Sequence, residues 1–215
     1  VSFTVAQNFL MALMRKRRDF GRFNLVDVWT SLAPDSSPNP LYWPAVKPSE
    51  LIPQMAGLRI GFQLGSRNHL RRWPVENFVQ LASELTRLIP EGELTWVLLG
   101  SADERALSAK FEKAGQGEGL AEPINLMGRT NMEELGQVTA GLDLLVTADT
   151  GVMHLAAAVG TPVLALFFGP AYGPETGPYG PGHIIYQAAA TCAPCRESGD
   201  CRRRQCLEMP VPGLA

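Results

Sequence analysis

The loop at residues 65–74 combines a serine, three arginines and a tryptophan directly after an apolar stretch at residues 58–64. Arginine guanidinium groups match phosphate oxygens in two-point contacts, and backbone N–H groups at a helix start favour negative charge. The segment therefore predicts an anion site. A solvated basic loop, with Trp73 packed into the core, is an alternative that the loop by itself leaves open.

A second segment whose residues could bind a ligand spans residues 145–158. There an apolar strand pattern runs into a helix pattern through Asp149, Thr150 and Gly151. Thr150 or Asp149 can cap the helix, and Gly151 lets a ligand approach backbone N–H groups that can hold a diphosphate. His154 lies one helical turn further on. Asp149 can equally serve only as a cap, and a lone histidine in an apolar helix is more often a core residue than a catalyst.

The four cysteines gather near the C-terminal end, as Cys192, Cys195, Cys201 and Cys206. The first two have the two-residue spacing of zinc and iron–sulfur ligands, so a structural metal site is one interpretation. Free thiols and disulfides are the others, because spacing alone cannot distinguish them. Clustering in one segment fits a reducing compartment with one local site better than a disulfide-stapled secreted protein.

The elements that would position these segments alternate between strand and helix. Apolar stretches predict strands at residues 58–64, 94–99, 124–126, 142–147 and 162–168. Helices are expected at residues 74–89, 103–114, 132–140 and 151–159, with Pro74 in a first turn and Asn131 with Glu134 as a capping pair. The alternation predicts an α/β fold, a doubly wound, Rossmann-like parallel sheet whose ligands bind beyond the carboxyl ends of the strands.

The first 53 residues have a different pattern. Apolar residues at helical spacing predict short helices within residues 3–14 and 24–32, and prolines recur within residues 34–53 without periodicity. We therefore expect a boundary after residue 53, with a Rossmann-like domain and its cysteine-rich end spanning residues 54–215. No stretch reaches the ~20 uninterrupted apolar residues of a membrane span, and the start lacks the basic leading region of a secretory signal.

Composition narrows the class of protein. With 46% hydrophobic and 19% charged residues, the chain is neither disordered nor fibrous. A formal net charge of -2 gives no overall attraction to nucleic acid or anionic lipid. The basic runs at residues 15–18 and 202–204 are solvated faces or local contacts with a membrane surface, and neither has the interleaved aromatic residues of single-strand nucleic-acid sites.

In order and spacing, five motifs together resemble glycosyltransferase family 9, the lipopolysaccharide heptosyltransferases. They are Arg-Arg-Trp-Pro (71–74), Leu-Leu-Gly-Ser-Ala-Asp-Glu (98–104), Asp-Thr-Gly-Val-Met-His-Leu-Ala-Ala-Ala (149–158), Gly-Thr-Pro-Val-Leu-Ala-Leu-Phe (160–167) and Gly-Pro-Tyr-Gly-Pro (177–181). The resemblance spans about residues 24–209. It implies one half of a GT-B glycosyltransferase, the C-terminal, donor-binding half. Residues 1–53 would then be the tail of the N-terminal domain and the interdomain connection, and residues 54–215 the nucleotide-sugar-binding domain. Such an enzyme transfers heptose from an ADP-sugar to the lipopolysaccharide core at the cytoplasmic membrane face, with inversion and without a required cofactor.

The resemblance also implies roles for single residues. Ser66, Arg67 and Arg71 would face the diphosphate, Glu104 the ribose, and Gly128, Arg129 and Thr130 the adenine region; Asp149, Thr150, Gly151 and His154 would close the diphosphate and sugar pocket. Arg71 stands where the family usually has lysine, which keeps the charge that stabilises departing ADP but changes the geometry. The sequence leaves open which sugar is carried, since Met153 and Tyr179 could shape the sugar pocket in several ways.

The family places its catalytic base, an aspartate, in the N-terminal domain, so the resemblance implies that this chain binds donor and transfers poorly or not at all alone. A non-catalytic nucleotide-sugar-binding module that acts with a partner chain is the alternative. A sugar-nucleotide epimerase of GT-B architecture fits the motifs less well. Some family members carry a similar cysteine-rich stretch, which does not decide between metal, free thiols and disulfides.

Overall fold

A computed structural model describes residues 24, 26, 27, 47, 49–53, 57–90, 92–195, 201 and 204–207. The expected helix at residues 3–14, the basic run at 15–18, and most of the expected helix at 24–32 and of the proline-rich connection lie outside the described residues. The boundary after residue 53 therefore stays a prediction. Within the described part of the chain, no helix is long and apolar enough to cross a membrane.

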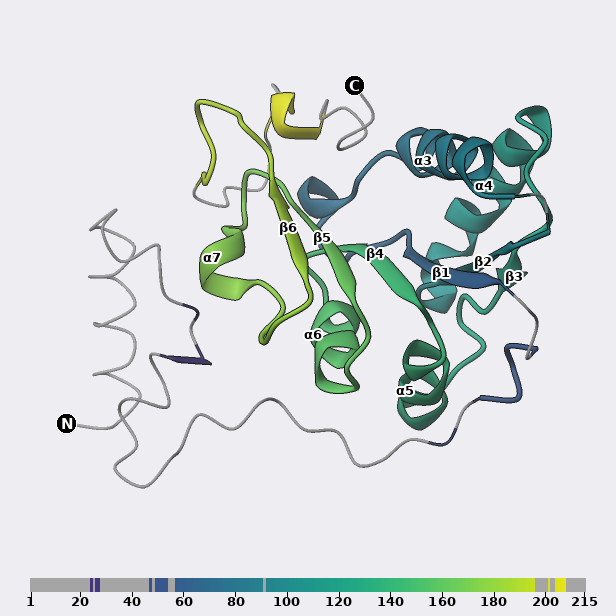
Figure 1. The fold of residues 1–215 in the computed structure, drawn as a ribbon. Helices are drawn as coiled ribbons and strands as arrows, with labels where there is room; N and C mark the ends of the chain where they lie inside the picture. The colour runs from purple at the N-terminus through teal and green to yellow at the C-terminus, as the bar shows by residue number, and fades with distance from the viewer. Residues whose placement is uncertain are drawn as a thin grey trace.

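The described residues form one parallel sheet in the strand order β3-β2-β1-β4-β5-β6 (Figure 1). The strands are β1 (Leu58–Gln63), β2 (Leu94–Leu99), β3 (Ile124–Asn125), β4 (Leu144–Ala148), β5 (Val163–Phe167) and β6 (Ile184–Gln187). The chain leaves β1 toward one edge of the sheet and returns to β4 on the other side, so the strand order reverses between them. This order confirms the doubly wound, Rossmann-like fold and predicts a ligand crevice beyond the carboxyl ends of β1 and β4.

Helices cover both faces of the sheet (Figure 1). One face carries α3 (Val75–Leu88) and α4 (Arg105–Gly117), and the other carries α5 (Met132–Ala140) and α6 (Gly151–Ala158). Shorter pieces are α7 (Gly173–Thr176) and the 3-10 turns η2 (His69–Arg71), η3 (Ala102–Glu104) and η4 (Gln205–Leu207). The strands and helices expected between residues 58 and 168 are thus confirmed within a few residues at each end, whereas α7 and β6 were not predicted.

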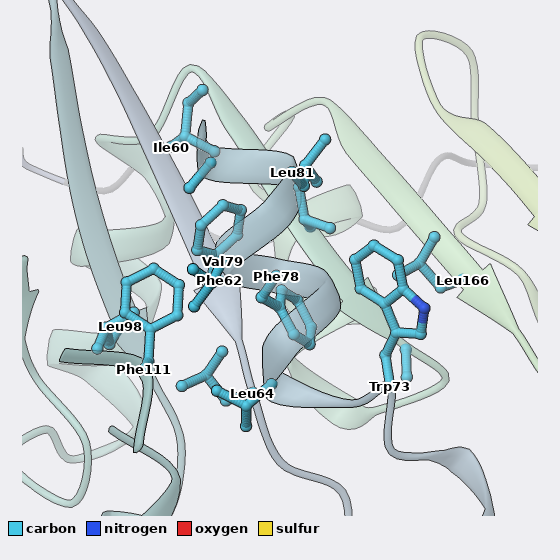
Figure 2. Packing of buried hydrophobic residues seen from close by; sticks show 14 of the residues in the cluster. Ile60, Phe62, Leu64, Trp73, Phe78, Val79, Leu81, Leu98, Phe111 and Leu166 are labelled. Carbon is cyan, nitrogen blue, oxygen red and sulfur yellow. The ribbon is translucent and has the colours of Figure 1, made fainter. Parts of the chain in front are cut away.

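Aromatic side chains fill the face covered by α3 and α4 (Figure 2). The ring of Phe62 on β1 stacks on Trp96 with centroids 5.3 Å apart and lies 5.4 Å from Phe78. Trp73, which ends the loop after β1, meets Phe78 edge-on at 4.9 Å and is only 2% exposed. Because such pairs stabilise beyond the area they bury, this face holds the start of α3 firmly against the sheet.

Mostly aliphatic and small side chains, with Phe167 as the one aromatic ring among the described residues of the cluster, fill the face covered by α5 and α6. Val97, Leu145 and Ala156 are completely buried there. At Gly61 on β1, an added Cβ would collide with the Leu142 side chain, so a glycine is needed for close packing at this point.

Two helix starts follow the sequence closely. Asn131 caps α5 with both bonds of a capping box, since its side chain accepts from Glu134 N at 2.9 Å and Glu134 accepts from Asn131 N at 2.8 Å. Pro74 is the residue before α3 and not its first helical residue, one position from the prediction.

Candidate functional site

An open cleft of about 1260 Å³ lies at the carboxyl ends of the central strands, where the strand order predicts it. Its walls come from the loops that follow β1, β2, β3 and β4. Eight of the residues predicted to bind donor line it, namely Ser66, Arg67, Arg71, Glu104, Thr130, Asp149, Thr150 and Gly151. Segments up to 85 positions apart in the sequence, from Ser66 to Gly151, therefore meet in one cavity.

The loop after β1 is held in a fixed shape by its own hydrogen bonds. Asn68 Oδ1 accepts from Leu70 N at 2.9 Å and starts the turn η2. Arg72 Nε donates to Ser66 O at 2.6 Å and closes the loop at its base. With Trp73 buried directly behind it, this loop presents Arg71 from a rigid support.

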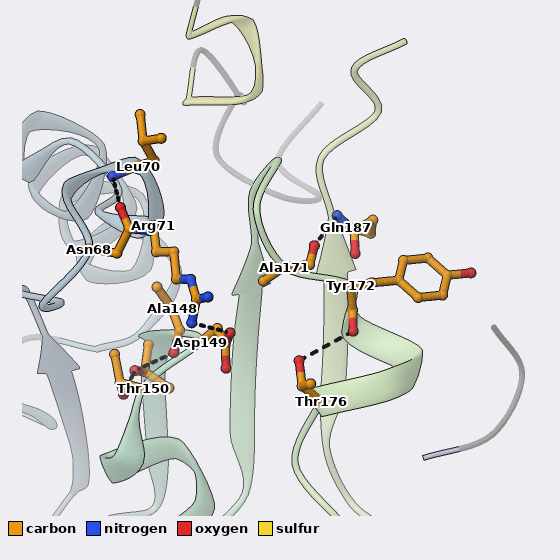
Figure 3. A network of polar contacts seen from close by, with 11 residues as sticks. Asn68, Leu70, Arg71, Ala148, Asp149, Thr150, Ala171, Tyr172, Thr176 and Gln187 are labelled. Atoms are coloured by element: carbon orange, nitrogen blue, oxygen red, sulfur yellow. Dashed lines mark hydrogen bonds and ion pairs between the residues drawn. The ribbon is translucent and has the colours of Figure 1, made fainter. Parts of the chain in front are cut away.

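Arg71 and Asp149 join the two sides of the cleft (Figure 3). Arg71 Nη1 lies 2.8 Å from Asp149 Oδ2, with side chains that are 28% and 12% exposed. The pair links the loop after β1 to the turn after β4, the two strands between which the sheet order reverses. A half-buried guanidinium thus lies at the position where a fold of this type binds phosphate.

Thr150 is the N-cap residue of α6, as predicted, but its side chain makes no capping hydrogen bond. The Thr150 hydroxyl lies 3.0 Å from Thr147 Oγ1, and the Asp149 carboxylate pairs with Arg71. Gly151 and Val152 line the cleft at the first turn of α6, where backbone N–H groups have no acceptor within the helix. These groups can bind an anion.

Glu104 braces the loop after β2 against the loop after β1. Its carboxylate accepts from Ser101 N at 3.1 Å and lies 3.6 Å from Arg72 Nη2. It also covers Gly65 so closely that a Cβ at Gly65 would collide with it. The predicted ribose contact is therefore a carboxylate held in place by the protein, with its side chain 11% exposed.

The three residues of the predicted adenine region are placed differently from one another. Thr130 lines the cleft, whereas Gly128 and Arg129 are not among the lining residues. Gly128 has φ 65° and packs on the loop after β2, where a Cβ would come within 2.5 Å of Ala102 Cα. Gly128 therefore shapes the loop that presents Thr130, and Arg129 is exposed.

His154 is half-buried on α6 and is not among the lining residues. Burial lowers the pKa of His154 below its ordinary value, and the negative charge of Asp149 opposes this shift. Met153 is completely buried in the aliphatic core, and Tyr179 donates to Asp27 Oδ1 at 2.8 Å. Neither lines the cleft, so the expectation that they shape it is not met.

The four cysteines are free thiols. Cys195 and Cys206 lie on the same side of Gly169, since a Cβ there would be 3.0 Å from one sulfur and 3.3 Å from the other. Burial raises the pKa of the Cys195 thiol, and the neighbouring cysteines raise it further. Among the described residues, which include all four cysteines, no group of three or more potential ligands is placed to hold a metal ion. A metal here stays a prediction from the spacing alone.

Sequence reasoning missed several residues that line the cleft, among them Gln63, Arg72 and Met132. Arg72 belongs to a motif that had been recognised, but its contacts with Ser66 and Glu104 depend on how two loops fold together. Gln63 did carry a signal, because it is the polar residue that ends an apolar strand next to the predicted site.

Comparison with known proteins agrees with this geometry. The profile of glycosyltransferase family 9 (heptosyltransferase) matches residues 48–205. Lipooligosaccharide heptosyltransferase 2 of Haemophilus influenzae is 35% identical over 123 residues, 57% of this chain and 33% of that protein. Lipopolysaccharide heptosyltransferase 2 of Salmonella typhimurium is 32% identical over 156 residues, 67% of this chain and 42% of that protein. The chain therefore spans less than half the length of these relatives.

A solved structure gives the same result. The Escherichia coli ADP-heptose LPS heptosyltransferase II is similar with a TM-score of 0.57 and 26% identity, over 70% of this chain and 47% of that one. The matched share is that expected for one half of a GT-B enzyme. With a doubly wound sheet, a cleft at its switch point and a profile match over most of its length, this chain belongs to glycosyltransferase family 9.

Proposed function

We propose that this chain is the donor-binding domain of an inverting heptosyltransferase that takes an ADP-sugar as donor and the lipopolysaccharide core as acceptor. One observation carries the proposal: Arg71 and Asp149, from the two loops at the switch point, meet at 2.8 Å in a single cleft. The relatives are heptosyltransferases, and one of them is named for ADP-heptose, which supports the sugar and the base.

The charges in the cleft suit a nucleoside diphosphate. Arg67 and Arg71 supply cations, and the first turn of α6 supplies backbone N–H groups at the positive end of a helix. Glu104 and Thr130 line the same cavity and offer hydrogen-bond partners to a ribose and a base. The diphosphate would lie between the loop after β1 and α6, with the nucleoside toward the loops after β2 and β3.

In transfer, an acceptor hydroxyl loses its proton to a base and attacks the anomeric carbon of the sugar while ADP leaves. The negative charge that grows on the departing diphosphate would be stabilised by Arg71 and by the N-terminal turn of α6. Burial lowers the pKa of His154 and so disfavours its charged form, although the nearby Asp149 carboxylate opposes this shift. We assign the base to the other domain of the enzyme, which would also bind the acceptor at the cytoplasmic face of the membrane.

A non-catalytic module that binds a nucleotide-sugar and acts with a partner chain would use the same cleft. Transfer separates the two functions. We expect ADP release from ADP-heptose, in the presence of lipopolysaccharide core acceptor, only when the family's N-terminal domain is joined to this chain. Arg71→Ala should then reduce the rate by about 100-fold, and Arg71→Lys, which installs the residue usual in the family, should retain most of it.

Lys110→Ala is the matched control, because Lys110 is an exposed cation that pairs with Glu76 on the outer surface of α3 and α4. Its transfer rate should equal that of the parent. Donor binding without transfer in the joined protein would support the module instead of the enzyme.

A further inference from the structure

Gln63 places a buried amide at the base of the cleft. It is the last residue of β1, in register between Leu99 of β2 and Thr147 of β4. Only 6% of Gln63 is exposed, yet it lines the cleft. A polar side chain in this central row, on a face filled mostly by aliphatic residues, calls for hydrogen-bond partners.

The orientation of this amide follows from one hydrogen bond. Gln63 Nε2 donates to Gly65 O at 3.3 Å, and the reversed amide would instead bring two acceptor oxygens together. The amide oxygen Oε1 is left buried and without a hydrogen-bond partner among the described residues. The nearest polar residue in the row, Thr147, bonds through its hydroxyl to Ala148 O at 2.9 Å and to Thr150.

A buried acceptor with no donor is destabilising, and it is found where a ligand supplies the missing donor or where function requires strain. The diphosphate of the proposed donor carries only acceptors, so it cannot satisfy Gln63. The amino group of adenine is also a donor, but we place the base at the loop after β3 that carries Thr130, away from the end of β1. The ribose and the transferred sugar both carry hydroxyl groups, and a hydroxyl is a donor.

We propose that, when donor binds, a rotation of the Gln63 side chain brings the buried Oε1 to the cleft, where it accepts a hydrogen bond from a hydroxyl group of the sugar nucleotide. This contact would make Gln63 a specificity-determining residue of the cleft. The inference rests on the proposed function, because it requires a sugar nucleotide in this cavity. In this account, Gln63 recognises a hydroxyl group, whereas the arginines and the N-terminal turn of α6 bind the negative charge of the diphosphate.

The test is a set of calorimetric titrations of the parent chain and of Gln63→Met, which keeps the length of the side chain and removes its acceptor. The ligands are ADP, 2′-deoxy-ADP, 3′-deoxy-ADP and ADP-heptose. Gln80→Met is the matched control, because Gln80 is exposed on α3. Thermal melting of each variant shows whether it is folded.

If Gln63 contacts a ribose hydroxyl, the parent chain should bind one of the two deoxy-ADP ligands about tenfold more weakly than ADP. Gln63→Met should bind that ligand and ADP with equal affinity. If it reads the transferred sugar, the parent should prefer ADP-heptose over ADP, and Gln63→Met should lose about tenfold of that preference. Either coupling supports the inference, and Gln80→Met should show neither.

An equal loss for every ligand, or no loss, would overturn the inference while leaving the proposed function intact, since ADP would still bind the parent. Failure of the parent to bind any of the ligands would overturn the proposed function, and this inference with it. If Gln63→Met does not fold, the titrations of the parent chain decide. Equal affinity of the parent for ADP, both deoxy-ADP ligands and ADP-heptose would contradict a hydroxyl contact.

Discussion

The two faces of the sheet are packed with different kinds of side chain, and each face supports a different part of the cleft. The face under α3 and α4 is rich in aromatic rings, and its Trp73 directly follows the loop that carries Arg71. The face under α5 and α6 is aliphatic and close-packed around Gly61, and it supports the turn that carries Asp149.

The contrast separates two ways of positioning a charge. Large rings with fixed mutual angles anchor an irregular loop, which has no regular hydrogen-bond ladder of its own. Small residues instead let a helix approach the sheet closely, so that the first turn of α6 opens at the cleft. Arg71 and Asp149 meet at the point where these two packed supports face each other across the cleft.

The largest effect should come from the aromatic face. Trp73→Ala removes a ring that is 2% exposed and packs on Phe78, and we expect a loss of about 3–5 kcal/mol in the free energy of unfolding. Urea denaturation measures it. Leu88→Ala is the control, since Leu88 is 68% exposed and should change stability little. A loss for Trp73→Ala no larger than that of the control would contradict the anchoring role.

Arg71→Ala tests whether the anchored loop presents a phosphate-binding cation. Loss of charge-assisted hydrogen bonds should weaken ADP binding by about 10–100-fold. Adenosine lacks the diphosphate, so its affinity should not change. Calorimetry of both ligands gives the comparison, and an equal loss for adenosine would show that the variant disturbs the cleft as a whole.

Gly61→Ala tests the close packing of the aliphatic face. The added methyl group would collide with Leu142, and we expect about 1–3 kcal/mol of destabilisation from overpacking. Gly117→Ala is the matched control, because no described atom lies within 4 Å of a Cβ at that position. Equal denaturation midpoints for the two variants would show that the α5 and α6 face accommodates the added methyl group, and would contradict the close packing.

The smallest effect concerns pH. The pKa of His154 is lowered in the folded chain, mainly by burial, so the unfolded chain binds more protons as the pH falls below the ordinary value of 6.5. Stability should therefore decrease with acidification through that window, by about 1 kcal/mol or less. His154→Gln should flatten the curve, and an unchanged slope in the variant would assign the effect to other groups.

The fold was predictable where apolar periodicity is strong, as in β1, α3, β2 and α5. The sequence around α7 and β6 is rich in glycine and proline, which hides the short helix. Ile184 and Ile185 are adjacent in β6 and both exposed, so β6 lacks the alternation that indicates a strand. The N-cap position of Thr150 was predictable, but its hydroxyl lies 3.0 Å from that of Thr147, which is near the end of the buried strand β4.

Within the site, residues that carry charge next to strand ends were predictable from type and position, as Arg71 and Asp149 show. Contacts between loops were not. The bond from Arg72 to Ser66 and the packing of Glu104 on Gly65 depend on how two loops fold against each other, which no local pattern encodes. Gln63 was overlooked because a single polar residue in an apolar strand does not indicate a site until its burial is known.

The central claim is that this cleft binds the nucleoside diphosphate of an ADP-sugar. Calorimetric titration of ADP, UDP and GDP into the purified chain, with Asp149→Ala beside it, tests that claim most directly. We predict selective binding of ADP that weakens when Asp149 no longer holds Arg71 in place. Failure to bind any of the three nucleotides, or equal affinity for all of them, would contradict the claim.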